Sequence, residues 1–219
     1  MFDKHNPRVF YTLITVGLLI LLIGLVGCGP IDQRRSVHED RAAASSVLVG
    51  HVQGHGSGVV VGQNRVLTNR HVVEGVMGGV VILFDNGNER ASRVLWKGEG
   101  TVDLALIEVD TGDAPVAEID CSRSPRGREV FTYGNPLAFR GVMTWGHVAT
   151  NNENFADQLA DAQLLDMHVI PGNSGGGVWS AADGRLVGIA TAMITHNGSI
   201  TGHSVMLSAS AICREVPHL

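Results

Sequence analysis

The chain has little positive charge for its size. Its 219 residues contain 16 lysines and arginines against 21 aspartates and glutamates, a formal charge of −5 at pH 7. Binding to a phosphate backbone requires a concentrated basic surface, because Lys and Arg must neutralise the phosphates. The composition therefore argues against nucleic acid as a partner.

Proline and charged residues are also scarce. The sequence has 7 prolines and 17% charged residues, against 28 glycines and 44% hydrophobic residues. This balance excludes a largely disordered chain and predicts a folded domain with many tight turns. At this length one mid-sized domain, or a domain of two small halves, is expected.

One long apolar run lies near the N-terminus. Residues 9–27 carry no charge over nineteen positions, enough for a helix to cross a hydrocarbon core about 30 Å thick. Lys4 and Arg8 precede the run, and such charges favour the cytoplasmic side, so the rest of the chain is expected to be exported. Leu-Val-Gly before Cys28 resembles a bacterial lipobox, which would make Cys28 a lipidated first residue. Residues 1–28 are therefore either a cleaved signal peptide or an uncleaved membrane anchor.

The chain after the apolar run divides into a tether and a domain. Residues 29–42 are polar and charged without apolar periodicity, which predicts a linker. The domain is expected to cover residues 43–219. Cys121 and Cys213 lie within it, and their spacing does not decide between a disulfide and two free thiols, with free thiols slightly favoured.

The domain is rich in short β-branched runs separated by turn residues, a pattern typical of strands. About twelve strands with almost no helix favour a closed barrel or a sandwich over an α/β fold. Asn86-Gly87 and Asp183-Gly184 predict tight hairpins, and residues 208–216 are the only good helical candidate. The expected strand regions are residues 46–52, 56–62, 65–69, 79–96, 103–110, 128–135, 141–150, 162–169, 175–181, 184–194 and 202–209.

A serine in a glycine-rich turn gives the strongest local signal. Ser174 lies in the sequence PGNSGGG, between two apolar strands. An acyl-transfer nucleophile must stand clear of the backbone, and small neighbours let main-chain N–H groups point at the developing oxyanion. We expect Gly172 and Ser174 to supply those donors. An ordinary glycine loop is the alternative.

A serine nucleophile needs a general base, and His71 is the best-placed histidine. It follows two apolar strands and the sequence VLTNR, at a turn that would present its ring. His51 and His55 lie four residues apart, but their glycine-containing β context does not align them as helical metal ligands. No metal site is therefore predicted.

The imidazole in turn needs an acid that fixes its tautomer. Asp103 opens the apolar run DLALIEV, which suits a partly buried carboxylate. It could instead cap the preceding turn, and Glu99, Asp85 and Asp110 are competing acids.

These three segments together resemble the trypsin-like serine peptidases, specifically the bacterial HtrA or Deg group. The segments are GSGVVV with VLTNRHVV, then VDLALIEV, then PGNSGG, and EVFTYGNP and GRLVGI are also similar to that group. The order histidine, aspartate, serine is the chymotrypsin order and not that of subtilisins or α/β-hydrolases. The resemblance covers roughly residues 45 to 213.

The resemblance implies two packed six-stranded antiparallel barrels, with the active site in their seam. Asp166 matches an aspartate that shapes the loop beside the site in that group. The strand Ile189, Ala190 and Thr191 is expected to offer backbone groups to an extended peptide. The chain ends without the PDZ domain usual in HtrA proteins, so regulation by peptide-tail sensing is not implied.

Two departures concern substrate contacts. Arg70 precedes the histidine where smaller or polar residues are frequent in the family. His168 and His203 are candidates for lining the primary specificity pocket, where they would favour an acidic side chain; they could equally be solvent-facing strand residues.

The sequence therefore predicts a serine endopeptidase that needs no cofactor and cleaves unfolded or flexible extracytoplasmic polypeptides. Its partners would be polypeptide substrates and, through the N-terminal anchor, a membrane; an oligomer is possible. One alternative is a catalytically silent, membrane-tethered peptide-binding module of the same fold. Another is an esterase that uses the same triad.

Overall fold

The parts of the chain that the computed structural model describes are residues 33–76, 79–150, 159 and 161–217. The apolar run at residues 9–27 and Cys28 lie outside these ranges, so the anchor and its lipidation stay predictions. Among the described helices, none is both long and apolar enough to span a membrane. Contacts within the chain divide it into residues 1–36 and a second unit, Val37–Leu219, which holds the strands.

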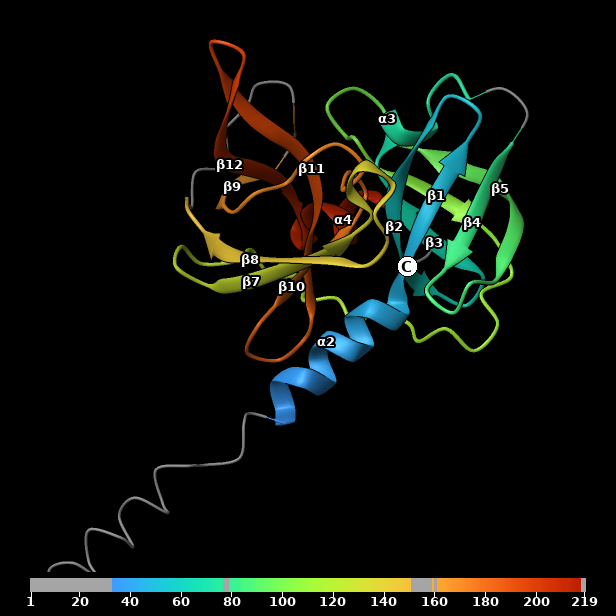
Figure 1. The fold of residues 1–219 in the computed structure, drawn as a ribbon, viewed down its shortest axis with the longest axis horizontal. Coiled ribbons are helices and arrows are strands. Elements are labelled where there is room, and N and C mark those ends of the chain that lie inside the picture. The colour runs from blue at the N-terminus through green and yellow to red at the C-terminus, as the bar shows by residue number, and fades with distance from the viewer. Residues whose placement is uncertain (1–32, 77–78, 151–158, 160, 218–219) are drawn as a thin grey trace, which may run out of the picture. The chain divides into compact units, whose positions relative to one another are not determined.

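Two closed antiparallel barrels form the body of the second unit (Figure 1). Within the described residues, the first barrel has the strand order β1-β2-β3-β6-β5-β4 and the second has β10-β11-β12-β9-β8-β7. This confirms the predicted all-β class with two six-stranded barrels. The strands are β1 (Ser46–His51), β2 (Gly54–Gly62), β3 (Arg65–Thr68), β4 (Val80–Phe84), β5 (Glu89–Lys97), β6 (Ala105–Glu108), β7 (Glu129–Gly134), β8 (Val142–Val148), β9 (Ala162–Asp166), β10 (Gly177–Ser180), β11 (Leu186–His196) and β12 (Ser199–Ser208).

Both predicted hairpins are present. Gly87 has φ 87° between β4 and β5, and its N–H donates to the Phe84 carbonyl at 2.9 Å. Gly184 has φ 68° between β10 and β11, and its N–H donates to the Ser180 carbonyl at 2.9 Å. Glycine suits these positions because a Cβ disfavours positive φ.

Alternation along the strands builds three apolar clusters. Successive side chains of a strand point to opposite faces. Val60 and Ile107 therefore belong to the interior of the first barrel, whereas the neighbouring Val59 and Leu106 belong to a cluster shared with the second barrel, which includes Trp179. The second barrel has its own interior cluster. The shared cluster fixes the seam between the barrels by burying apolar surface from both.

Three helices and one short 3₁₀ segment, η1, accompany the barrels in the described parts of the chain: α2 (Gln33–Ser45), α3 (Arg70–Val73), η1 (Pro136–Ala138) and α4 (Ala209–Glu215). Helix α4 confirms the predicted C-terminal helix. Helix α2 was not predicted, because residues 29–42 lack apolar periodicity. It contains three Ala and three Arg, which are good helix formers, and Ala42 is buried in the shared apolar cluster.

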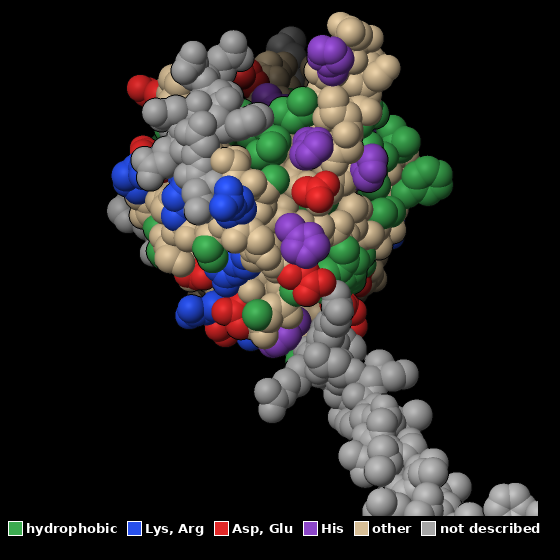
Figure 2. Space-filling view, turned by 90° about the vertical axis from the view of Figure 1, so that its left-hand side faces the viewer, with side chains coloured by type: hydrophobic (Ala, Val, Ile, Leu, Met, Phe, Trp, Pro, Cys, Tyr) green, Lys and Arg blue, Asp and Glu red, His purple; other side chains and the backbone are tan. Residues whose placement is uncertain are grey.

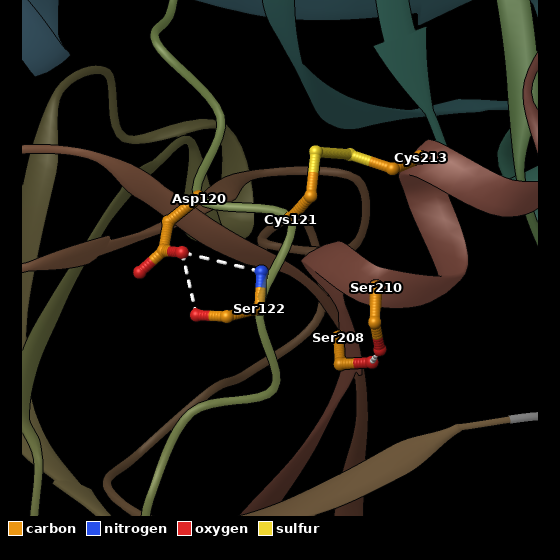
Figure 3. Close-up of a disulfide and its surroundings, with 6 residues drawn as sticks. All are labelled: Asp120, Cys121, Ser122, Ser208, Ser210 and Cys213. Carbon is orange, nitrogen blue, oxygen red and sulfur yellow. Dashed lines mark hydrogen bonds between the residues drawn. A yellow bond between two sulfur atoms is a disulfide. The ribbon is translucent and has the colours of Figure 1, made fainter.

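A disulfide joins Cys121 to Cys213, with the Cα atoms 5.8 Å apart (Figure 3). The slightly favoured expectation of two free thiols is therefore wrong. Cys121 lies in the connection between the barrels and Cys213 in α4, and their separation of 92 residues hid this proximity from the sequence.

The neighbouring Asp120 is held by hydrogen bonds. Ser122 donates its backbone N–H and its hydroxyl to Asp120 Oδ1 (Figure 3), and Arg128 donates to Oδ2 at 2.8 Å. Burial acts to raise the pKa of Asp120, but the Ser122 and Arg128 contacts outweigh it and hold that pKa below its ordinary value.

Candidate active site

A histidine–carboxylate pair lies at the end of the first barrel. His71 Nδ1 is 2.6 Å from Asp103 Oδ2, and the His71 backbone N–H donates to Asp103 Oδ1 at 2.9 Å. The Asp103 side chain is 9% exposed, whereas that of His71 is 46% exposed. The carboxylate therefore accepts a proton at Nδ1 and leaves Nε2 available as a base.

The local sequence explains this pairing. β3 ends at Thr68, and the single turn α3 that follows presents the His71 ring. Asn69 donates from Nδ2 to the Asp103 carbonyl at 2.8 Å, which fixes the backbone that carries the acid. Arg70 donates to the carbonyls of Gly98 and Gly100, so its head group organises the loop before the acid.

The competing acids lie in other surroundings. Asp85 accepts a hydrogen bond from the Tyr133 hydroxyl at 3.3 Å. The Asp110 side chain is 74% exposed beside Arg90, and Glu99 is exposed. Of the four candidate acids, Asp103 is the one that contacts the imidazole.

The serine turn of the second barrel has a well-defined backbone. Asn173 donates its N–H to the Ile170 carbonyl at 3.1 Å, which closes a turn with Pro171 and Gly172 at its centre. Gly172 has φ 100°. Proline followed by a residue of positive φ defines a type II turn. Ser174 directly follows the last residue of this turn, Asn173.

At the two predicted oxyanion donors, Gly172 and Ser174, the carbonyls accept hydrogen bonds, whereas the N–H groups remain available. Within the described chain, the N–H groups of Gly172 and Ser174 donate no hydrogen bond. Ser57 of β2 donates its hydroxyl to the Gly172 carbonyl at 2.8 Å and its N–H to the Ser174 carbonyl at 2.8 Å. Unpaired amides held in this way are suited to binding a developing oxyanion.

The Ser174 hydroxyl points to a different acceptor from the one expected. Its Oγ donates to the Thr191 carbonyl at 3.2 Å, and no hydrogen bond joins it to His71 among the described residues. The two side chains nevertheless belong to one region. A Cβ at Gly56 would lie 2.8 Å from the side chain of Val72, which follows His71, and 2.9 Å from the Ser174 carbonyl.

A cavity of about 300 Å³ opens beside Ser174. Its lining is mainly apolar and consists of Val169, Ile170, Pro171, Ser174, Thr191, Ala192 and Met193. His168 and His203 are not among these residues, so the predicted contact of the two histidines with the pocket is not found.

The two histidines lie instead on the outer surface of the second barrel. Both are exposed, and His203 is in register with Asp166, which also faces His147 on β8. Figure 2 shows several histidine side chains on this side of the molecule, with acidic side chains between them. The role of Asp166 beside the active site stays a prediction.

Part of the predicted substrate strand already has its backbone groups paired within the chain. Ile189 and Ala190 are fully buried. The Ala190 N–H donates to the Gly176 carbonyl and its carbonyl accepts from the Gly175 N–H, both at 2.9 Å. Both backbone groups of Ala190 are therefore engaged within the chain, and substrate pairing along this strand stays a prediction. Thr191, which lines the cavity at a β-bulge, keeps that possibility.

Sequence reasoning missed the residues that join the barrels at this site. The predicted strand over residues 56–62 contains Ser57 and the VLTNR segment contains Asn69, but neither residue is predicted to have a role in the site. Asn69 also donates to Thr191 Oγ1 at 3.1 Å. A polar residue beside apolar strand residues and close to a catalytic motif was the available signal, because such a residue needs a hydrogen-bond partner when the strand is buried.

Metal-ligating groups do not gather in the described part of the chain. In residues 33–76, 79–150, 159 and 161–217, no group of three or more His, Cys, Asp and Glu side chains is arranged to hold a metal ion. His51 and His55, which lie near each other in sequence, have separate partners: Gln53 for His51, Asn135 and Ala138 for His55.

Residues 56–189 match the family model of the trypsin-like peptidase domain. The chain belongs to this family. It is 32% identical over 178 residues to the serine protease HtrA-like proteins of Staphylococcus aureus strains USA300 and NCTC 8325. The match covers 73% of this chain but 22% of the relatives, so the chain corresponds to less than a quarter of their length.

Solved structures of peptidases share the fold. The HtrA-type protease AlgW with a tripeptide has a TM-score of 0.70 at 25% identity, over 80% of this chain and 59% of that one. The serine endoprotease from Yersinia pestis has a TM-score of 0.71 at 23% identity, over 84% of this chain and 65% of that one. The expected resemblance to HtrA-like trypsin-type peptidases is thereby confirmed.

Proposed function

We propose that this member of the trypsin-like peptidase family is a serine endopeptidase with the triad His71, Asp103 and Ser174. The observation that carries the proposal is the contact of 2.6 Å between His71 Nδ1 and the nearly buried Asp103 carboxylate. Such a contact fixes the tautomer that a general base requires. The relatives are named serine proteases, which supports the same chemistry.

In the proposed reaction, His71 Nε2 takes the proton of the Ser174 hydroxyl while Oγ attacks the substrate carbonyl. Asp103 stabilises the imidazolium that forms. The free amides of Gly172 and Ser174 receive the oxyanion, and the imidazolium then protonates the leaving amine. Before attack, the Ser174 hydroxyl must turn from the Thr191 carbonyl toward His71. Catalytic hydrogen bonds often tighten only when substrate is bound.

The cavity beside Ser174 supports a preference for substrates with an aliphatic residue before the cleaved bond. Val169, Ile170 and Ala192 present hydrocarbon to it, and Pro171 and Met193 extend the same surface. An acidic side chain would lose hydration there without gaining a positive partner. We propose flexible or unfolded polypeptide segments as substrates, since the cleaved chain must extend along Thr191.

A second candidate is a silent peptide-binding module of the same fold. It is favoured by one observation, the hydrogen bond from Ser174 Oγ to the Thr191 carbonyl rather than to His71. In that case the cavity would bind extended peptides without cleaving them.

Cleavage of unfolded casein separates the two candidates. The wild-type protein should cleave it, Ser174→Ala should lose activity by several orders of magnitude, and Ser199→Ala on the exposed β12 start should keep it. The melting temperatures of all three proteins should agree within a few degrees. Equal cleavage by wild type and Ser174→Ala would reject the triad, and absence of cleavage by the folded wild type would favour the silent module.

We further propose that the domain is exported and tethered to a membrane by residues 1–28. The disulfide between Cys121 and Cys213 supports an oxidising compartment, where such bonds persist. Intact mass of protein extracted from membranes tests the anchor: a lipidated Cys28 as first residue or a retained Met1 supports it. A soluble chain that begins elsewhere would contradict it.

A further inference from the structure

A histidine outside the proposed triad contacts the turn that neighbours the oxyanion donors. His55 lies near the start of β2 and is half-buried. Its Nε2 is 3.0 Å from the Asn135 carbonyl oxygen and 3.1 Å from the Ala138 nitrogen. The ring of a first-barrel residue thus bridges both ends of a second-barrel turn, residues 135–138.

The bridged turn has a backbone that needs support. Leu137 has φ 50° and ψ 31°, and Ala138 has φ 66°, so two successive non-glycine residues are left-handed. Such a backbone is strained, and the conformation persists only where surrounding contacts hold it. Nε2 contributes such a contact in either neutral tautomer, because it donates to Asn135 when protonated and accepts from Ala138 when not.

The turn at residues 135–138 fixes the Pro171–Gly172 peptide, whose N–H is one of the proposed oxyanion donors. The Leu137 N–H donates to the Pro171 carbonyl at 2.9 Å. The described chain contains no cis peptide bond, and in a planar trans peptide the C=O and N–H point in opposite directions. The bond to the Pro171 carbonyl therefore also fixes the direction of the Gly172 N–H.

These contacts converge on Gly172 itself. A Cβ at this residue would lie 2.5 Å from the Asn135 carbonyl oxygen, 2.8 Å from His55 Nε2 and 3.0 Å from the Leu137 nitrogen. The ring, the strained turn and the type II turn are thus packed directly against one another. A displacement of the ring would be transmitted to the Pro171–Gly172 peptide over two contacts.

We propose that His55 is a positioning residue of the oxyanion hole, which holds the Gly172 N–H in its donating orientation through the turn at residues 135–138. This role rests on the proposed peptidase function. It requires no contact between His55 and substrate. The effect of losing it should fall on kcat, because oxyanion donors act mainly in the transition state.

The test compares His55→Leu with His55→Gln and His51→Leu on a fluorogenic peptide drawn from a casein cleavage site. Losing an oxyanion donor outright costs about 10²–10³ in kcat, so His55→Leu should lower kcat about 10-fold or more with KM changed less than about 3-fold. His55→Gln should recover most of kcat, because its amide can donate to Asn135 and accept from Ala138. His51→Leu is the matched control, since the His51 ring is also half-buried but contacts Gln53 of its own hairpin.

A second measurement uses a peptide aldehyde of the same sequence, whose adduct with Ser174 places an oxygen in the oxyanion hole. Its Ki should rise in His55→Leu by about the factor by which kcat falls. The inference is wrong if kcat and Ki of His55→Leu match those of His51→Leu, or if His55→Gln is as impaired as His55→Leu. If His55→Leu does not fold, His55→Met takes its place in the same comparison: a 10-fold loss of kcat that His55→Gln restores supports the role, and kcat and Ki equal to those of His51→Leu reject it.

Failure of the proposed function has a different signature. In that case the wild-type protein and His51→Leu cleave nothing and form no aldehyde adduct.

Discussion

The two halves of the candidate site are built in different ways. The first barrel supplies His71 and Asp103, which contact each other directly and are held by neighbours of the same barrel, Asn69 and Arg70. The second barrel supplies Ser174, whose turn is held from the other side of the seam by Ser57. The proposed base and its acid are thus assembled within one barrel, whereas the proposed nucleophile and oxyanion turn depend on how the barrels pack.

This difference suggests where the site can be adjusted. The hydroxyl of Ser174 donates to Thr191 while the His71–Asp103 pair is already formed. Changes at Asp103 should therefore act mainly on the base, whereas changes at Asn69 should also reach Thr191. Changes at the seam should alter the oxyanion turn while the pair stays intact.

The largest effect is expected from Asp103→Asn. The amide cannot accept the Nδ1 proton in the same way, so the ring would adopt the wrong tautomer, and kcat should fall about 10⁴-fold. Asp110→Asn, at the 74% exposed side chain, should leave kcat unchanged. Steady-state kinetics on a peptide substrate measure both, and a loss below 10-fold in Asp103→Asn would remove this acid from the triad.

A smaller effect is expected from Ser57→Ala. The change removes the hydroxyl that donates to the Gly172 carbonyl and accepts from the Asn135 N–H, but keeps the Ser57 N–H bond to Ser174. We expect kcat to fall about 10-fold and the free energy of unfolding by about 1–3 kcal/mol, because buried polar groups lose their partners.

Ser180→Ala in β10 is the matched control for this change. Its hydroxyl is also buried but has no hydrogen-bond partner within the described chain. Kinetics and denaturant unfolding of the two variants should differ clearly. Equal kcat in Ser57→Ala and Ser180→Ala would show that the seam does not hold the oxyanion turn.

The smallest effect should appear in Asp120→Asn, since the Asp120 carboxylate accepts hydrogen bonds from Ser122 and Arg128. Because the pKa of Asp120 is lower in the folded protein than its ordinary value, its charged form stabilises the fold above the unfolded pKa of about 3.9, and this contribution is lost as pH falls through the folded value. The variant should lose about 1 kcal/mol at pH 7 and progressively less toward pH 2, with kcat unchanged. Denaturant unfolding at several pH values measures this, and a loss independent of pH would contradict the assignment.

Much of the fold follows from local pattern in the sequence. The β-branched runs and the glycines at positions 87 and 184 predicted strands and hairpins that are present in the structure. Helix α2 was not predicted, because its residues favour a helix but show no apolar periodicity. Motif order pointed to His71 and Asp103, which the structure brings into contact.

The contacts that could not be predicted join residues far apart in the sequence. Ser57 and Gly172 are 115 positions apart, and His55 and Asn135 are 80 apart, so neither pair leaves a local pattern. The β-bulge at Thr191 and the backbone pairing of Ala190 with the serine turn were not predicted either. Periodicity describes which face a residue takes but not where such pairing ends.

Activation of Ser174 by His71 is tested most directly by the rate at which a fluorophosphonate labels the folded protein, with the modified residue identified by mass spectrometry. We expect one adduct, on Ser174. It should form quickly in the wild type and more slowly by orders of magnitude in His71→Ala, because the serine needs its base. An unlabelled Ser174, or equal labelling rates in the two proteins, would contradict this expectation.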